Sequence, residues 1–187
     1  MERNIVSKGV NLQDIEVWDV SIEELELYDA QCKIECWIGM DTHTKRDKMY
    51  VGFDPGTANL GIAVIDDNIK LFQIKIDNKP KDPIKRMKLA NKLLSHCVNS
   101  YKYNTVLVIE GAAFSKRYRE AELSEVRATA VWWGIKNGFD VQMYVPNKIR
   151  KAVFGSGKKR PQEEWASLPP DAANALACAW YPLLSSK

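Results

Sequence analysis

The stretch YVGFDPGTANLGIAVID, residues 50–66, places one acidic residue, Asp54, between two apolar runs. Each run is rich in aliphatic and β-branched residues, which is typical of buried strands. The Pro-Gly pair after Asp54 is typical of a tight turn, so the stretch predicts two neighbouring strands joined by that turn. Aspartate is common before Pro-Gly in turns, and only the rest of the chain can show whether Asp54 also has a chemical role.

Strand and helix patterns continue downstream of this stretch in a regular order. We expect strands over residues 50–53, 60–66, 70–76, 105–109 and 140–145, and helices over residues 83–98, 119–137, 147–153 and 171–183. The first three strands form a meander, and a helix then carries the chain to a parallel strand. The order βββαβαβα predicts an α/β fold with a mixed five-stranded sheet flanked by helices.

Residues 1–47 are predicted to be an acidic extension, and residues 48–187 the main domain. The extension has 5 Lys or Arg against 11 Asp or Glu, whereas the main domain has 22 against 13. Residues 21–31 are expected to form a short acidic helix, because Ser21 and Glu24 have the spacing of a capping box. CKIECWI, residues 32–38, is expected to be a strand. The extension could cover the basic main domain, mediate dimerisation or bind a partner, and the sequence leaves all three open.

The composition is that of a globular protein, with 45% hydrophobic and 27% charged residues. We expect no membrane partner, because neither a signal-peptide core nor a run of the roughly 18 apolar residues of a membrane span is present. The expected location is cytoplasmic and nucleoid-associated, or host cytoplasm or an organelle if the chain is viral or organellar. Reduced thiols are expected for the four cysteines, although Cys32, Cys36 and His43 leave a zinc site open. The basic main domain is typical of proteins that bind nucleic acid.

Three acidic residues stand at the ends of predicted elements. Asp54 ends the first strand of the main domain, Glu110 ends the fourth (VLVIEG), and Asp171 begins the last helix (PPDAANALACA). Asp54 and Glu110 meet at the carboxyl edge of the sheet if their strands are parallel neighbours. Gathered carboxylates repel one another and are usually neutralised by divalent cations, and oxygen ligands favour Mg²⁺ or Mn²⁺. Small residues such as Gly52 and Gly61 permit the close backbone approach that such a site needs.

Three motifs resemble the RuvC family of Holliday-junction resolvases, within the RNase H-like superfamily. They are a strand with DPGTxxxG, a strand with IEGxxF, and PPDAANALACA, in that order. SEVRA, which contains Arg127, and YVPNKIRKAVFGSGKK are similar to the segments that lie between these motifs in the family. The resemblance covers roughly residues 49–182. It implies an RNase H-like fold and a Mg²⁺-dependent (or Mn²⁺-dependent) endonuclease that resolves four-way DNA junctions.

The resemblance also implies roles for individual residues. Asp54, Glu110 and Asp171 would be the acids of a two-metal site, with Asp54 bridging the ions. Asn174 stands where the family has a fourth acid, three residues after the third, and would face the same site as a weaker, neutral ligand. Three accounts of Asn174 stay open: a natural variant with three acids, a natural inactive binder, or an Asp-to-Asn change made to trap a complex.

A DNA surface around the site is implied as well. Lys158 or Lys159 would steady the scissile phosphate. Phe114 would stack near an unpaired base, although it stands four residues after Glu110 and the family's aromatic stands three after. The expected DNA-binding residues are Phe114, Lys116, Arg117, Arg119, Arg127, Lys148, Arg150, Lys151, Lys158, Lys159 and Arg160.

A four-way junction has two-fold symmetry, so the resemblance implies a homodimer. The implied interface is the helix face around Ala130, Val131, Trp132 and Trp133. Trp132 and Trp133 are adjacent, so both cannot face one core, and at least one is expected at the interface.

Other functions remain possible at this stage. DPGTANLG also resembles the phosphate hairpin of actin-like and kinase ATPases, but no second phosphate loop follows it. Asn174 suggests a catalytically inactive junction-binding protein. An RNase H-like nuclease acting on branched DNA or RNA–DNA hybrids would share the acids, although a hybrid nuclease would lack the SEVRA and Gly-Ser-Gly segments. The chain between the Gly-Ser-Gly loop and the last helix is also shorter than is usual in the RuvC family.

Overall fold

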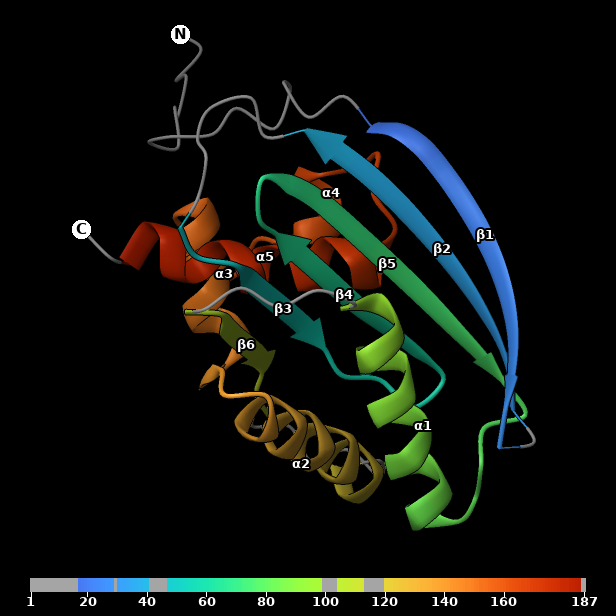
Figure 1. The fold of residues 1–187 in the computed structure, drawn as a ribbon. Coiled ribbons are helices and arrows are strands. Elements are labelled where there is room, and N and C mark those ends of the chain that lie inside the picture. Colours follow the sequence, from blue (N-terminus) through green and yellow to red (C-terminus); the bar gives the residue numbers. More distant parts are fainter. Residues whose placement is uncertain (1–16, 29, 41–46, 99–103, 113–119, 186–187) are drawn as a thin grey trace, which may run out of the picture.

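The protein is built around one mixed β-sheet (Figure 1). The computed structural model describes residues 17–28, 30–40, 47–98, 104–112 and 120–185. Its strands are β1 (Val17–Leu27), β2 (Ala30–Met40), β3 (Tyr50–Asp54), β4 (Asn59–Ile65), β5 (Asn68–Asp77), β6 (Val106–Glu110) and β7 (Asp140–Tyr144). Its helices are α1 (Pro83–Cys97), α2 (Glu120–Lys136), α3 (Pro146–Phe154), α4 (Pro161–Glu164) and α5 (Pro170–Ser185). In these described residues the sheet has seven strands, in the order β1-β2-β5-β4-β3-β6-β7.

The five strands predicted for the main domain are confirmed. β3, β4 and β5 pair antiparallel as a meander, because short turns join them. β6 then pairs parallel with β3, and β7 parallel with β6. The return to a parallel strand needs a crossover, which α1 provides before β6 and α2 before β7.

β1 and β2 extend the sheet beyond this predicted core. β2 pairs antiparallel with β5 and β1 with β2, so residues 21–31 are not the expected acidic helix. That prediction was wrong because the capping-box spacing is a local signal, whereas Leu25 and Leu27 alternate on a strand and pack against the core. The strand predicted over residues 32–38 is confirmed within β2. The division of the chain at residue 48 into an extension and a main domain stays a prediction.

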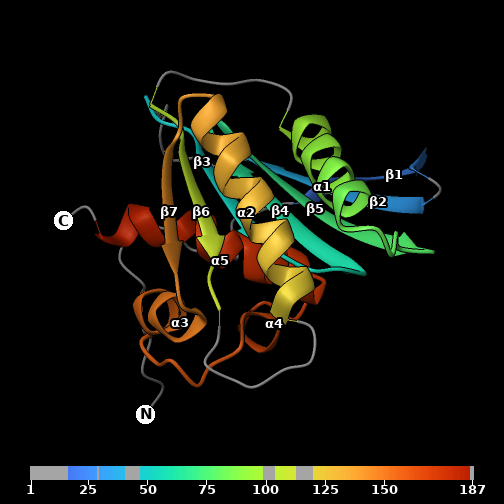
Figure 2. The same cartoon turned by 90° about the horizontal axis from the view of Figure 1, so that it is seen from below.

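Helices cover both faces of the sheet, as Figures 1 and 2 show, and a hydrophobic core lies on each face. α1 and α2 lie side by side on one face, over buried residues that include Phe53, Ile62 and Leu93. α5 crosses the other face, where its alanine-rich side packs with α3 on the sheet. The predicted flanking helices therefore cover both faces.

α5 lies close to the sheet at two glycines. A Cβ on Gly52 of β3 would overlap the carbonyl oxygen of Ala175, and a Cβ on Gly61 of β4 would overlap the carbonyl oxygen of Asp171. The close approach expected from small residues is therefore present. This seating places the first turn of α5 directly over β4.

The stretch between α3 and α5 contains the short helix α4, which was not predicted. The Trp165 ring packs edge-on against Phe154 with 4.9 Å between the ring centroids. The backbone N–H groups of Glu163 and Glu164 donate to the Arg160 carbonyl at 2.9 and 3.2 Å. The sequence does not indicate this helix, because the contact between Phe154 and Trp165 beside it forms only in the tertiary structure.

The cysteines are reduced thiols, as expected. Cys32, Cys97 and Cys178 are buried, and Cys36 is half-buried. His43, which the open zinc site would need, lies outside the described residues. No helix in the described part of the chain is long and apolar enough to span a membrane.

Candidate active site

Asp54 and Glu110 lie beside each other because the strands that they end are parallel neighbours. In the parallel pairing of β3 and β6, Phe53 lies opposite Ile109. Each of these residues directly precedes one of the two acids. The Glu110 carboxyl lies close enough to Asp54 to raise its pKa, in addition to the effect of burial. The expected meeting of these two residues is present, and their catalytic roles stay predictions.

The first turn of α5 brings two more polar residues to this pair. Asn174 Nδ2 donates to Asp54 Oδ2 at 2.9 Å. Asp171 lies three residues earlier, on the same helix face, and its charge acts on Asp54. The backbone N–H of Asp171 donates to Gln73 Oε1 at 3.3 Å, so a side chain from β5 anchors the start of α5. Gln73 was not predicted, because nothing in a buried strand pattern marks one residue as a helix anchor.

The site concentrates negative charge where little water reaches it. Asp54 is 9% exposed. Burial, the charge of Glu110 and the hydrogen bond with that carboxyl raise the pKa of Asp54 well above its usual range, whereas the Asn174 amide acts to lower it. Burial also raises the pKa of Asp171, against the lowering effect of its own backbone N–H. Nearby cations would favour the ionised forms of both groups.

The oxygen-rich donor set suits magnesium or manganese better than zinc. In the described residues, no three His, Cys, Asp or Glu side chains are grouped closely enough to hold a metal ion by themselves. Asp54 and Glu110 are in contact, and Asp171 acts on them through its charge. Asn174 donates to Asp54 through its nitrogen, and turning its amide by about 180° would present the oxygen instead. Two contacting carboxyls, a third acid and an amide therefore fit a divalent cation that completes the set with water.

Two arginines approach Glu110 from different helices. Arg150 of α3 has Nη2 4.0 Å from Glu110 Oε1. Arg127 of α2 donates from Nε to the main-chain carbonyl of Glu110 at 3.2 Å and from Nη1 to Glu120 Oε1 at 2.6 Å. Both had been predicted as DNA contacts, but their contacts with a candidate catalytic acid had not. No sequence signal marks them, because α2 and α3 meet Glu110 only through the tertiary structure.

The other basic residues on α3 are exposed. Lys148 places Nζ 4.5 Å from the ring centroid of Tyr144, and Lys151 lies one turn further along. The predicted DNA-binding residues Phe114, Lys116, Arg117 and Arg119 lie outside the described residues.

Three predicted DNA-binding residues follow α3. Lys158 is exposed. Lys159 pairs with Glu164 at 2.7 Å, and Arg160 pairs with Glu163 at 3.8 Å. The two glutamates therefore compensate part of the positive charge of this stretch. The role of Lys158 or Lys159 at the scissile phosphate stays a prediction.

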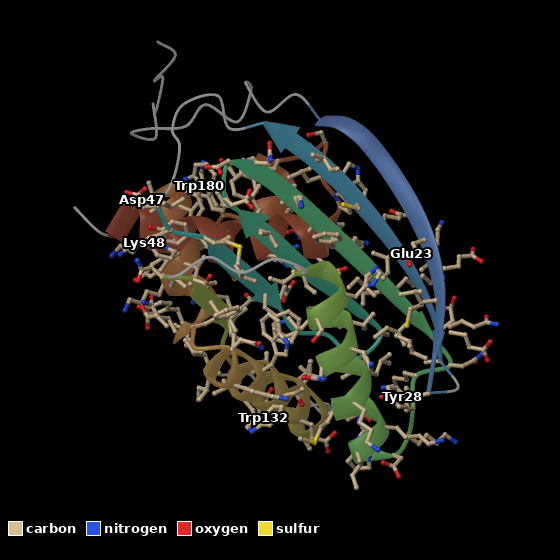
Figure 3. All side chains as sticks on the ribbon, in the orientation of Figure 1. Glu23, Tyr28, Asp47, Lys48, Trp132 and Trp180 are labelled. Carbon is tan, nitrogen blue, oxygen red and sulfur yellow. The ribbon has the colours of Figure 1, made fainter. Side chains whose placement is uncertain are left out.

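The helix face predicted as the dimer interface is divided between core and surface. Ala130 and Trp133 are buried, with the Trp133 ring edge-on to Phe139 at 5.3 Å, so the prediction was wrong for these two residues. α2 turns this side toward α1 and the sheet. Val131 is half-buried. Trp132 is 57% exposed. It is labelled in Figure 3 on the outer side of α2, away from the sheet.

The sequence is similar to those of known proteins. The model of the family described as "Crossover junction endodeoxyribonuclease RuvC" matches residues 50–165. A protein of that name from Pseudothermotoga lettingae is 29% identical over 147 residues, covering 69% of this chain and 90% of that protein. Another from Treponema denticola is 30% identical over 147 residues, covering 69% of this chain and 82% of that protein.

Solved structures have the same fold. The Thermus thermophilus RuvC structure matches with a TM-score of 0.59 at 17% identity, covering 74% of this chain and 95% of that one. The structure of T. thermophilus RuvC in complex with Holliday junction substrate matches with a TM-score of 0.60 at 20% identity, covering 74% and 94%. The predicted RNase H-like fold is thus confirmed. Because the family model spans more than half of the sequence and includes Asp54 and Glu110, this chain belongs to the RuvC family of crossover junction endodeoxyribonucleases.

Proposed function

We propose that this protein is an endonuclease that resolves four-way DNA junctions. The observation that carries the proposal is the contact between Asp54 and Glu110 beneath the first turn of α5, in a chain of this family. A protein of the same family has been solved with a Holliday junction substrate. DNA as substrate also agrees with the basic main domain and with the expected cytoplasmic, nucleoid-associated location.

Asp54, Glu110 and Asp171 would hold the magnesium or manganese ions, with Asn174 as an amide contact. When bound, such ions supply an activated water and stabilise the leaving 3′ oxygen of the cleaved phosphodiester. Burial, and after it the charge of neighbouring acids, raises the pKa values of Asp54 and Asp171. This supports the assignment, because bound cations would favour the ionised forms of both carboxyls. Asn174 brings one negative charge fewer than a fourth acid, which weakens the hold on the metals.

The residues around the acids would bind and orient the DNA. Arg150 lies beside Glu110, and its guanidinium can donate two parallel hydrogen bonds to a phosphate. Lys158 is the other candidate for binding the scissile phosphate. Lys148 and Lys151 extend the basic surface along α3, where they would contact phosphates of a junction arm.

The proposed enzyme acts as a homodimer, because two symmetric cuts resolve a two-fold symmetric junction. Trp132 and Ile135 support an interface on α2. They are 57% and 64% exposed and lie on one helix face, three residues apart. Exposed apolar side chains of this size are common at protein interfaces.

The test is a cleavage assay on a mobile four-way junction with and without Mg²⁺. We expect paired symmetric nicks from the wild type in Mg²⁺, none after chelation, and none from Asp54→Asn. Tight junction binding without cleavage in Mg²⁺ or Mn²⁺ would instead establish an inactive junction-binding protein, the alternative that Asn174 motivates. Preferential cleavage of an RNA–DNA hybrid in the same assay would overturn the proposed substrate.

A further inference from the structure

Arg127 lies between the end of β6 and the first turn of α2. Its side chain is 12% exposed. Nε donates to the main-chain carbonyl of Glu110, and Nη1 is held by the Glu120 carboxylate at 2.6 Å. The guanidinium is therefore committed to two partners within the protein.

The hydrogen bond from Arg127 is one of two that hold the peptide group between Glu110 and Gly111. On one side, the N–H of Gly111 donates to the Tyr144 carbonyl of β7 at 2.8 Å. On the other side, the carbonyl of Glu110 accepts from Arg127 at 3.2 Å. The peptide between Glu110 and Gly111 is thus held at both ends, at the point where the chain leaves the sheet. The direction of the Glu110 side chain depends on this peptide, because backbone torsions set the direction of the Cβ.

α2 is itself anchored next to the other acid. Glu122 accepts from Lys79 Nζ at 2.7 Å, and the same ammonium lies 3.5 Å from Thr57 Oγ1, three residues after Asp54. One turn later, Glu125 pairs with the buried Arg86 of α1 at 2.7 Å. The first turns of α2 are therefore linked to the Asp54 segment through Lys79 and to Glu110 directly through Arg127.

We infer that Arg127 is a positioning residue for Glu110 and not a DNA contact. The inference rests on the proposed function of Glu110, and it changes the role that the sequence suggested for Arg127. Glu120 already compensates the charge of Arg127, so the pair adds little to the positive field that DNA meets. A phosphate could engage the guanidinium only by displacing Glu120 or the Glu110 carbonyl.

The first experiment separates positioning from DNA binding. Junction affinity is measured in EDTA at several salt concentrations, and cleavage is measured in single turnover with saturating enzyme. For Arg127→Ala we expect junction affinity and its salt dependence to stay within about 2-fold of the wild type, and the cleavage rate to fall about 10- to 100-fold, the usual loss when support for a metal ligand is removed. Arg127→Lys, which keeps the charge and one donor, should recover part of the rate.

Lys151→Ala is the matched control for loss of one positive charge. Lys151 is exposed, and its removal should weaken binding and lower the slope of log affinity against log salt by about one. The same change in slope for Arg127→Ala would overturn the inference, as would an unchanged cleavage rate. Glu120→Gln should lower the cleavage rate, and the losses from Glu120→Gln and Arg127→Ala should not add, because both disturb one contact.

A second readout needs no substrate. Mn²⁺ alone is titrated against the wild type, Arg127→Ala and Arg127→Lys, and the rise in Tm is recorded. A smaller rise for Arg127→Ala supports positioning of Glu110, and equal rises overturn it. If the wild type cleaves no junction, the proposed function fails, while this titration still decides the role of Arg127. Circular dichroism checks the fold, and Arg127→Lys takes the place of Arg127→Ala if the alanine variant does not fold.

Discussion

At the scale of single residues, Asp54 is held in a buried position that is unfavourable for a lone carboxylate. The neighbouring Glu110 carboxyl adds to the effect of burial in raising its pKa, and Asn174 donates to it at 2.9 Å. Asp171 adds a further negative charge nearby. Such clustering lowers folding stability and is common at catalytic sites, where function requires it.

Asp54→Asn is expected to stabilise the metal-free protein at alkaline pH. The pKa of Asp54 is raised in the folded state, so above the unfolded value of about 4 the folded state holds the extra proton and stability falls as the pH rises. The substitution removes this loss, and its amide oxygen can still accept from Asn174. Thermal unfolding in EDTA should show a Tm higher by on the order of a few degrees at pH 8, and a smaller difference at pH 4.

Asp140→Asn is the control for that measurement. Asp140 is an exposed carboxylate on β7 that accepts from Gln142 Nε2 at 2.7 Å, and the introduced amide oxygen can keep this bond. Its Tm should differ little from that of the wild type at either pH. A Tm for Asp54→Asn below that of the wild type at pH 8 would show that burial of Asp54 carries no such penalty.

Asn174→Asp should have opposite effects with and without metal. Without metal, a fourth carboxyl replaces the donor to Asp54 and adds repulsion, so the Tm at pH 8 should fall. With Mg²⁺ or Mn²⁺, the added charge strengthens metal binding, and we expect cleavage to rise by about 10-fold or more. Asn174→Ala, which removes the amide and adds no charge, should not show this gain. The absence of any gain in Asn174→Asp would count against a site weakened by Asn174.

At the scale of secondary-structure elements, the packing of α5 on the sheet determines the position of Asp171. Gly61 lies under the first turn of the helix and Gly52 under its middle, where a Cβ would overlap the backbone of Asp171 and Ala175 respectively. The helix cannot move away without losing its contacts with β3 and β4. Two glycines on neighbouring strands therefore fix the distance between this helix and the acids of the sheet.

Gly61→Ala and Gly52→Ala form a matched pair for this seating. Each should lower the free energy of unfolding by about 1–3 kcal/mol, because backbone must shift to admit the methyl group. Gly61→Ala should also reduce cleavage more than Gly52→Ala, since the shift falls on Asp171 itself. Chemical denaturation and single-turnover rates measure the two effects. Equal activity of the two variants would mean that the position of Asp171 does not depend on Gly61.

At the scale of the whole molecule, the two edges of the sheet have different charge. β1 carries the exposed acids Glu24 and Glu26, with Glu23 labelled in Figure 3, at the edge opposite β7. The basic helix α3 follows β7 directly. DNA is therefore expected to approach from the β7 side, away from the β1–β2 hairpin.

Deleting residues 1–46 should destabilise the protein. β2 buries Ala30, Cys32 and Ile34 in the core that α1 covers, and their loss would expose Ile74 and Ile76 of β5. We expect a lower Tm and aggregation of the shortened chain, measured by thermal unfolding and light scattering. Ile34→Ala in the full chain should lower the free energy of unfolding by about 2–4 kcal/mol. A shortened chain as stable as the full one would show that residues 1–46 form a dispensable extension.

Trp132→Glu should dissociate the proposed homodimer without unfolding the protomer, because Trp132 is 57% exposed. Loss of a tryptophan at the centre of an interface typically costs at least about 2 kcal/mol of binding free energy. Sedimentation at micromolar concentration measures the change. Ile84→Glu is the control, since Ile84 is 63% exposed on α1 and should leave the oligomer intact. A monomeric wild type would remove the basis of this interface.

Much of the fold could be predicted because its signals are local. The apolar runs, the Pro-Gly turn after Asp54 and the helical spacing of residues 83–98 need no knowledge of distant residues. The helix predicted over residues 21–31 was wrong for the opposite reason, since β1 is a strand only because β2 and β5 pair beside it. Sequence also could not assign Trp133 to the core and Trp132 to the surface, because that depends on how α2 is turned toward α1.

The sequence by itself determined the five strands of the main domain, the helices that flank them and the residues able to do chemistry. The reason is that hydrophobic periodicity, turn residues and the motifs around Asp54, Glu110 and Asp171 are local features of the chain. Only the tertiary structure decided that Asn174 donates to Asp54, and that Arg127 holds the carbonyl of Glu110. These contacts join residues that are 120 and 17 positions apart, and they form only when α5 and α2 pack on the sheet. Asn174 and Arg127 therefore have these partners because of tertiary packing, which depends on the whole chain.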